Sequence, residues 1–172
     1  MKFNPQPKPE KKPKKVRKGI SKKKAYDEDL WDVFSVFIRL RFSDDNGYCS
    51  CITCGSTRYW KGQHMQAGHG IERQHWGTRY NLINVQVQCA GCNKFKQGAA
   101  DVFKTYLDKK HGPNTWDTLK ANKDGKKLTT FEMYYLQLDL QKKIEKLAEE
   151  RGIPFSEYKT KGWIKTVLNT NA

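Results

Sequence analysis

Residues 48–98 read YCSCITCGSTRYWKGQHMQAGHGIERQHWGTRYNLINVQVQCAGCNKFKQG, and this stretch decides the fold. It contains two Cys-x-x-Cys pairs, Cys51 with Cys54 and Cys89 with Cys92. Zinc prefers a tetrahedron of thiolates, and a two-residue gap lets one tight turn present two sulfurs to the same ion. The pairs therefore predict a structural zinc site and leave Cys49 as a spare thiol. A redox role is the alternative, but neither pair lies in a thioredoxin-type strand–helix unit.

The two cysteine pairs are far apart for a simple zinc motif. The 34 residues from 55 to 88 separate them, whereas a plain zinc ribbon has about 15–20. The extra length contains several side chains capable of proton transfer or metal binding: His64, His69, His75 and Asn84. We therefore expect this insertion to carry chemistry beyond zinc binding.

Three residues form a candidate hydrolytic site. The imidazole of His69 can take a proton from water and make it a nucleophile toward phosphorus. Asn93, in the first turn of a helix opened by the second cysteine pair, offers an oxygen to a hard cation such as magnesium. Such a metal would hold the phosphate and neutralise charge on the leaving oxygen. Asn84 can orient the imidazole and fix its tautomer. Each residue alone also has a structural explanation, since asparagine is a common helix cap.

The flanking sequence predicts three helices, over residues 27–42, 99–110 and 129–151. Acidic residues 27–29 suit the positive end of the first helix dipole. Thr129 or Thr130 is expected to cap the last helix, whose aromatic side chains are assigned to the core. Between the helices, two extended segments are expected: 63–71 and 82–88.

These patterns predict an α+β, mostly helical fold with a zinc-stapled core flanked by α-helices. We divide the chain into a disordered basic arm (1–24), a zinc-bound domain with its flanking helices (25–151) and a weakly structured C-terminal tail (152–172).

The formal net charge is +15, and residues 1–24 hold eleven basic side chains against one acid, Glu10. Such an arm favours a polyanionic partner, and nucleic acid is the usual one. A solvated solubility tail is the alternative, and an anionic membrane is disfavoured because the arm lacks an apolar face. No apolar run is long enough to span a membrane, and no secretory signal is visible. We therefore expect a cytoplasmic protein.

Six basic residues surround the candidate site in the sequence and are expected to contact DNA phosphates: Arg58, Lys61, Arg73, Arg79, Lys94 and Lys96. Such contacts give affinity that depends on salt and not on base sequence. No helix shows a clear base-reading face. We therefore expect the protein to recognise the shape of its DNA.

A series of residues carries a family resemblance: Ala67-Gly68-His69, Arg79-Tyr80-Asn81, Asn84, and Gln88-Cys89-x-x-Cys92-Asn93 with Lys96 and Gly98. Over roughly residues 26–151 the chain resembles the phage NinG proteins, also called Rap, and more broadly the HNH or ββα-metal endonucleases. The resemblance implies an HNH-type core that uses Mg²⁺ or Mn²⁺ to cut branched DNA, such as Holliday junctions, during phage recombination. It also implies His69 as general base, Asn93 as ligand of the catalytic metal, and the host-cell cytoplasm as location.

One departure concerns the second ligand of the catalytic metal. Many HNH enzymes carry an acid directly before the catalytic histidine, and here that position is Gly68. Three residues are candidates for the missing ligand: His64, Glu72 and His75. The alternative that His69 binds the metal and another group is the base stays open.

Other functional classes compete with this interpretation. The missing acid favours a zinc-dependent nucleic-acid-binding module without catalysis. A sequence-nonspecific or nicking nuclease of the same fold is a second alternative, and a purely structural zinc protein a third. A homodimer is expected for an enzyme that makes two symmetric cuts in a four-way junction, and the helix at 129–151 is the candidate interface.

Overall fold

The computed structural model describes residues 22–95 and 99–164. About half of them are helical, and two small antiparallel sheets complete an α+β fold. None of the helices in this part of the chain is long and apolar enough to cross a membrane. The predicted basic arm falls largely outside the described residues, except that Lys22–Lys24 belong to the first helix.

Helix α1 (Lys22–Arg41) begins before the predicted 27–42 segment, because the preceding residues include neither Pro nor Gly and continue the helix. The acids of residues 27–29 therefore do not lie in the first turn, at the positive end of the helix dipole. Asp27 instead pairs with the Arg79 guanidinium and accepts a hydrogen bond of 2.7 Å from the Tyr80 hydroxyl. This tertiary pairing explains the acid better than the local prediction did.

Two hairpins carry the cysteine-rich stretch. Strands β1 (Tyr48–Ser50) and β2 (Thr57–Tyr59), which were not predicted, form the first hairpin around the first cysteine pair. Strands β3 (Met65–His69) and β4 (Val85–Cys89) form the second, antiparallel with Met65 opposite Cys89 and His69 opposite Val85. They confirm the predicted extended segments in shorter form. One wide helical turn, η1 (Gly91–Phe95), follows β4 and carries Asn93.

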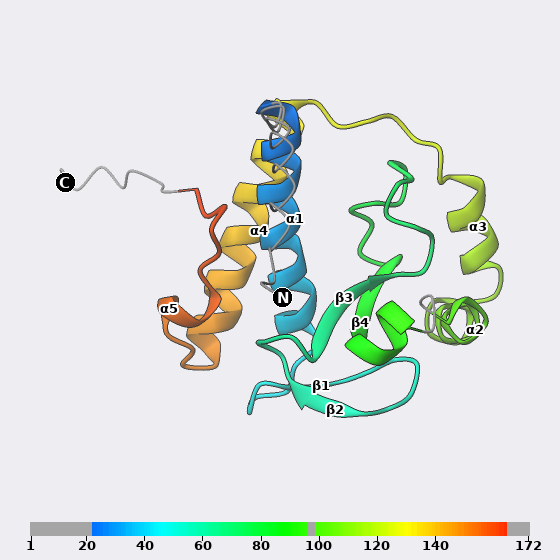
Figure 1. Cartoon of the computed structure of the whole chain (residues 1–172), viewed down its shortest axis with the longest axis horizontal. Helices are drawn as coiled ribbons and strands as arrows, with labels where there is room; N and C mark the ends of the chain where they lie inside the picture. Colours follow the sequence, from blue (N-terminus) through cyan, green and yellow to red (C-terminus); the bar gives the residue numbers. More distant parts are fainter. Residues whose placement is uncertain (1–21, 96–98, 165–172) are drawn as a thin grey trace, which may run out of the picture.

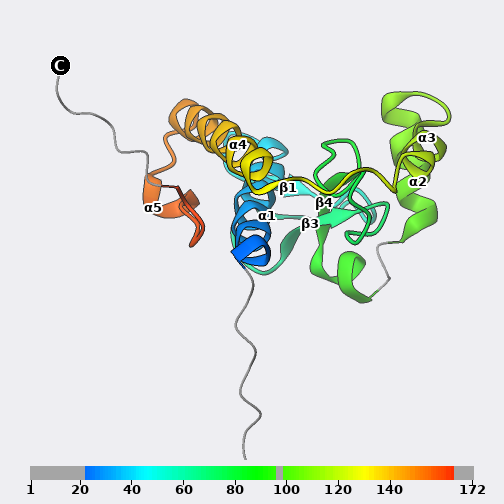
Figure 2. The same ribbon diagram turned by 90° about the horizontal axis from the view of Figure 1, so that it is seen from above.

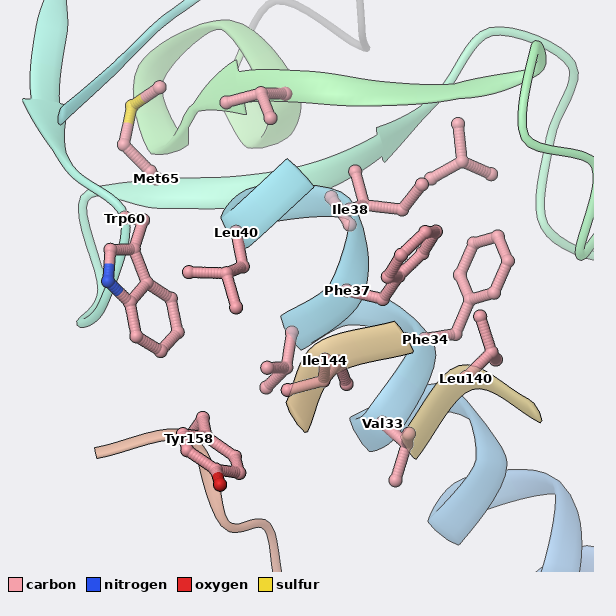
Figure 3. Packing of buried hydrophobic residues seen from close by; sticks show 14 of the residues in the cluster. Val33, Phe34, Phe37, Ile38, Leu40, Trp60, Met65, Leu140, Ile144 and Tyr158 are labelled. Carbon is pink, nitrogen blue, oxygen red and sulfur yellow. The ribbon is translucent and has the colours of Figure 1, made fainter. Parts of the chain in front are cut away.

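The core lies between α1, the β3–β4 sheet and helix α4 (Thr130–Glu150). Helices α1 and α4 lie side by side, with the sheet beside α1 and the short helices α2 (Ala100–His111) and α3 (Thr115–Ala121) at the far edge (Figures 1 and 2). Leu40, Trp60 and Ile144 pack where these elements meet (Figure 3). Burial of the α1 face on both the sheet and α4 fixes the hairpin that bears His69.

Helix α4 confirms its predicted limits but not its predicted core face. The Thr129 side chain and Glu132 form a capping box at its start. The aromatic side chains assigned to the core are exposed: Phe131, Tyr134 and Tyr135. The buried stripe instead includes Gln137 and Gln141, which donate hydrogen bonds to the carbonyls of Gly162 and Ile164. The glutamines are buried because those carbonyls need donors.

The segment after residue 151 differs from the predicted tail. Helix α5 (Phe155–Tyr158) packs Tyr158 into the main core next to Trp163. The chain near residues 162–164 lies against α4. The glutamine hydrogen bonds from α4 hold this segment in place. Residues 165–172 of the predicted tail lie outside the described residues.

Candidate metal centre and active-site cavity

The four predicted zinc cysteines come together between the two hairpins. The sulfurs of Cys51, Cys54, Cys89 and Cys92 all lie within 4.8 Å of one another, and Cys54 and Cys89 are 3.7 Å apart. Tetrahedral zinc with bonds of ~2.3 Å requires sulfurs about 3.8 Å apart, so the cluster could hold a metal such as zinc. Gly55, with φ +72, supplies the tight turn after the first pair. Cys49 stands outside the cluster and is buried, as expected for a spare thiol.

Two contacts prepare these sulfurs for a cation. Hydrogen bonds with the Ser56 hydroxyl and backbone lower the pKa of the Cys54 thiol to about 6. The backbone N–H of Cys92 donates to the Cys89 sulfur at 3.4 Å. Both contacts favour thiolate, the form that binds zinc.

His69 ends strand β3 in a defined orientation. Its Nε2 lies 2.9 Å from the Arg79 carbonyl oxygen, which only accepts, so Nε2 carries the hydrogen and Nδ1 keeps its lone pair. The Trp31 ring stacks on the imidazole with centroids 4.9 Å apart. Burial, opposed by the Arg79 hydrogen bond and aided by the charges of Arg73 and Arg79, lowers the pKa of His69 to about 4. The imidazole is therefore neutral at pH 7, as a general base must be.

Asn84 supports the site differently from its predicted role. It is fully buried, and its side chain bonds the backbone of Ile71 on both the N–H (2.7 Å) and the carbonyl (2.9 Å), and also the Thr78 carbonyl (3.0 Å). These bonds use its oxygen and both amide hydrogens, so the imidazole is oriented by the Arg79 carbonyl instead. Asn84 fixes the loop between β3 and β4 because buried backbone groups require partners.

A cavity of about 590 Å³ gathers the candidate catalytic groups from separate elements. His69 comes from β3, Asn93 and Lys94 from η1, and Glu72 and Arg73 from the loop after β3. Asn93 donates from Nδ2 to the Gln66 side-chain oxygen at 2.8 Å, and its own oxygen lies close to Gly68. An amide oxygen and a carboxylate in one cavity fit magnesium, which retains several water ligands.

The three candidates for the second metal ligand separate in the structure. Glu72 lines the cavity, whereas His64 and His75 are not among its lining residues. His75 lies instead between Glu72 (3.3 Å) and Asp124 (3.0 Å). At position 68 an added Cβ would meet the Gln88 side-chain oxygen at 2.0 Å, so an acid directly before His69 would require Gln88 to move. Glu72 is therefore the carboxylate that this site offers.

The predicted DNA-contacting residues have different environments. Arg73 and Lys94 line the cavity. Arg58 is exposed on β2, and Lys61 pairs with Glu157 at 2.8 Å, both away from its walls. The guanidinium of Arg79 is buried against Asp27 and the Arg73 carbonyl, so it does not face the solvent as the prediction of a DNA contact assumed. Lys96 lies outside the described residues.

Helix α1 supplies cavity residues that the sequence analysis did not assign to the site: Trp31, Ser35 and Arg39. Trp31 stacks on His69, and the Arg73 guanidinium lies 4.3 Å from the Trp31 ring centroid. The only sequence signal was a tryptophan at the margin of the apolar stripe. Whether Trp31 faces the core or the cavity depends on how α1 docks against the sheet.

Comparison with known proteins gives a consistent family. The family model described as "Bacteriophage Lambda NinG protein" matches residues 2–150. The protein ninG of Escherichia phage lambda is 25% identical over 141 residues, covering 80% of this chain and 65% of the relative. That of Salmonella phage P22 is 24% identical, covering 80% and 66%. The chain thus spans just under two thirds of the length of these relatives. No solved structure matches it.

Proposed function

The chain belongs to the NinG family, and from that premise we propose that it is a metal-dependent endonuclease that hydrolyses phosphodiester bonds in branched DNA. The observation that carries the proposal is the convergence of His69, Asn93 and Glu72 in one cavity with three cations, Arg39, Arg73 and Lys94. A neutral imidazole, two oxygen ligands and phosphate-binding cations are the groups that phosphodiester hydrolysis needs.

His69 is the proposed general base. Because Nε2 is occupied by the Arg79 carbonyl, Nδ1 is the nitrogen that takes the proton from the attacking water. Trp31 stacks on one face of the ring, and the low pKa of His69 keeps the imidazole unprotonated at neutral pH.

Asn93 and Glu72 are the proposed ligands of Mg²⁺ or Mn²⁺. When bound there, the metal supplies Lewis-acid stabilisation of charge on the phosphate and the leaving oxygen. Gln66 orients Asn93 through the 2.8 Å hydrogen bond. Arg73 and Lys94 bind flanking phosphates, which explains their place in the cavity wall.

The four cysteines are proposed to hold a structural zinc. Cys89 ends β4 shortly before η1, and Cys92 lies within η1. The metal would therefore fix the turn that carries Asn93. Two strands, a zinc cluster and a helical turn in this order support a ββα-metal core of the HNH type.

Branched DNA, as in a Holliday junction of phage recombination, is the proposed substrate. The net charge of +15 supports binding to phosphates, and the lack of a base-reading face among the predicted helices supports recognition of shape. Action as a homodimer in the host-cell cytoplasm belongs to the same proposal, because a four-way junction has two symmetric cleavage positions.

A cleavage assay tests the enzyme assignment. Synthetic four-way junctions and matched linear duplexes are incubated with wild type, His69→Ala and His64→Ala in the presence of Mg²⁺, Mn²⁺ or EDTA. His64→Ala is the matched control, because His64 is an exposed histidine that does not line the cavity. We expect metal-dependent junction cleavage that only His69→Ala abolishes, with junction binding retained.

The other outcomes separate the competing functions. Binding without cleavage under every condition would leave a non-catalytic zinc module, the alternative that the missing acid at Gly68 favours. Equal cleavage of junction and duplex would keep the chemistry and remove the branched-DNA specificity.

A further inference from the structure

A second cavity, of about 720 Å³, lies beside the zinc cluster and away from His69. Its walls come from the end of α1, the β1–β2 hairpin and α2. We call it the basic–aromatic groove, after the side chains that line its wall or rim: Arg41, Phe42, Tyr48, Tyr106 and Lys110. None of these residues has a role in the site described above.

Two cations are held at this groove by aromatic rings. The Arg41 guanidinium lies 4.8 Å and the Lys110 ammonium 4.5 Å from the centroid of Phe42. Lys110 also donates a 2.8 Å hydrogen bond to the Tyr106 hydroxyl. Within residues 22–95 and 99–164, neither cation forms an ion pair with a carboxylate. Two charges held close together and uncompensated make a site for an anion.

The acid in the groove wall forms no ion pair with either cation. The Asp44 carboxylate accepts hydrogen bonds from the backbone N–H groups of Asn46 (3.0 Å) and Tyr48 (2.8 Å), which hold it in the turn before β1. After burial, the charges of Lys110 and Arg41 are the causes that lower the pKa of His111. The groove therefore has one acid in its wall against two cations that form no ion pair with it.

The groove and the active-site cavity flank one two-stranded sheet. Ala67 of β3 lines the active-site cavity, Val87 of β4 lines the groove, and the two residues are register partners. Paired strands lie ~4.8 Å apart. The two cavities therefore border the same pair of strands.

We propose that the basic–aromatic groove binds a single-stranded segment of DNA, next to the strand held for cleavage. This inference rests on the proposed nuclease function and names one feature that the enzyme would select within branched DNA: unpaired nucleotides, such as those of a single-stranded arm at the branch. A concave groove accepts a flexible strand, whereas duplex reading requires an element that protrudes into a groove of the DNA. Sites for single strands combine cations with aromatic platforms, and Tyr48 is 48% exposed.

Fluorescence anisotropy with a short labelled oligothymidylate, without Mg²⁺ or Mn²⁺, tests this binding directly. Arg41→Gln/Lys110→Gln removes two phosphate contacts, each worth a slope of about 0.7 in log affinity against log salt for single strands. We expect about 25-fold weaker binding at about 0.1 M salt, and a slope reduced by about 1.4. The single variant Lys110→Gln changes an exposed side chain, leaves the fold intact, and should weaken binding about fivefold.

The control is Lys120→Gln/Lys142→Gln, which removes the same charge from exposed positions on α3 and α4 outside the groove. It should bind the oligonucleotide like wild type. Equal losses in both double variants, or no binding by wild type, would overturn the groove assignment. Photocrosslinking with bromodeoxyuridine adds a positional readout: adducts at Tyr48 or Tyr106 support it, and adducts confined to the active-site cavity refute it. Failure of the nuclease proposal would instead show as absent cleavage and leave these binding results unchanged.

Discussion

The pair between Asp27 and Arg79 should be a main determinant of stability. Their side chains are only 15% and 11% exposed, and Asp27 also accepts the hydrogen bond of the Tyr80 hydroxyl. Replacing Asp27 by Ala leaves the guanidinium buried without its counter-charge and the hydroxyl without this acceptor. Removing one partner of a buried pair costs about 3–5 kcal/mol. We therefore expect Asp27→Ala to lower the free energy of unfolding by about 3 kcal/mol or more.

Chemical denaturation followed by circular dichroism measures this loss. Glu28→Ala is the matched control, because Glu28 is half exposed and its contact with Lys24 is 3.9 Å long. Exposed pairs of this kind contribute about 0.3–0.5 kcal/mol. A loss below about 1 kcal/mol for Asp27→Ala would refute the reasoning, since the charge would then be solvated or re-paired.

The consequence extends to the active site, because Arg79 bonds His69 through its own carbonyl. Helix α1 therefore fixes the His69 imidazole from two directions, by Trp31 stacking and by the Asp27 contact. Under conditions where the variant is folded, Asp27→Ala should reduce the single-turnover cleavage rate more than substrate binding. An unchanged rate in the folded variant would show that the Arg79 carbonyl keeps its place without the ion pair.

Three further outcomes are expected. Zinc titration of the metal-free protein, followed by absorbance and proton release, should show one tight site that Cys54→Ser weakens and Cys49→Ser does not, because only Cys54 belongs to the cluster. The pKa of His69, about 4 in the folded protein against about 6.5 unfolded, gives stability that is fully present above pH 6.5 and lost as the pH falls toward 4. Urea titrations at several pH values should show this loss in wild type and a smaller one in His69→Asn. Glu72→Gln should raise the Mg²⁺ concentration needed for half-maximal cleavage about tenfold, whereas Asp124→Asn, outside the cavity, should leave it unchanged.

Local patterns in the sequence predicted the features whose causes are local. The spacing of the cysteines indicated the cluster, since two residues between ligands set the geometry of each turn. Alternation and helical periodicity indicated the extended segments that become β3 and β4, and the limits of α2 and α4 to within a few residues. The position of Asn93 directly after the second pair placed it in η1.

Contacts between distant segments decided the rest. The sequence analysis assigned Asp27 to the positive end of a helix dipole and Arg79 to contact with DNA phosphates. Only the docking of α1 shows that the two side chains form an ion pair with each other. The aromatic face of α4 is as apolar in sequence as a core face, yet Gln137 and Gln141 are buried because the chain near residues 162–164 supplies their acceptors. The sequence by itself determined the spacing of the four cysteines and supplied the candidate site residues. The tertiary structure decided which groups share a cavity, because a side chain's partners depend on long-range packing that no short window of sequence contains.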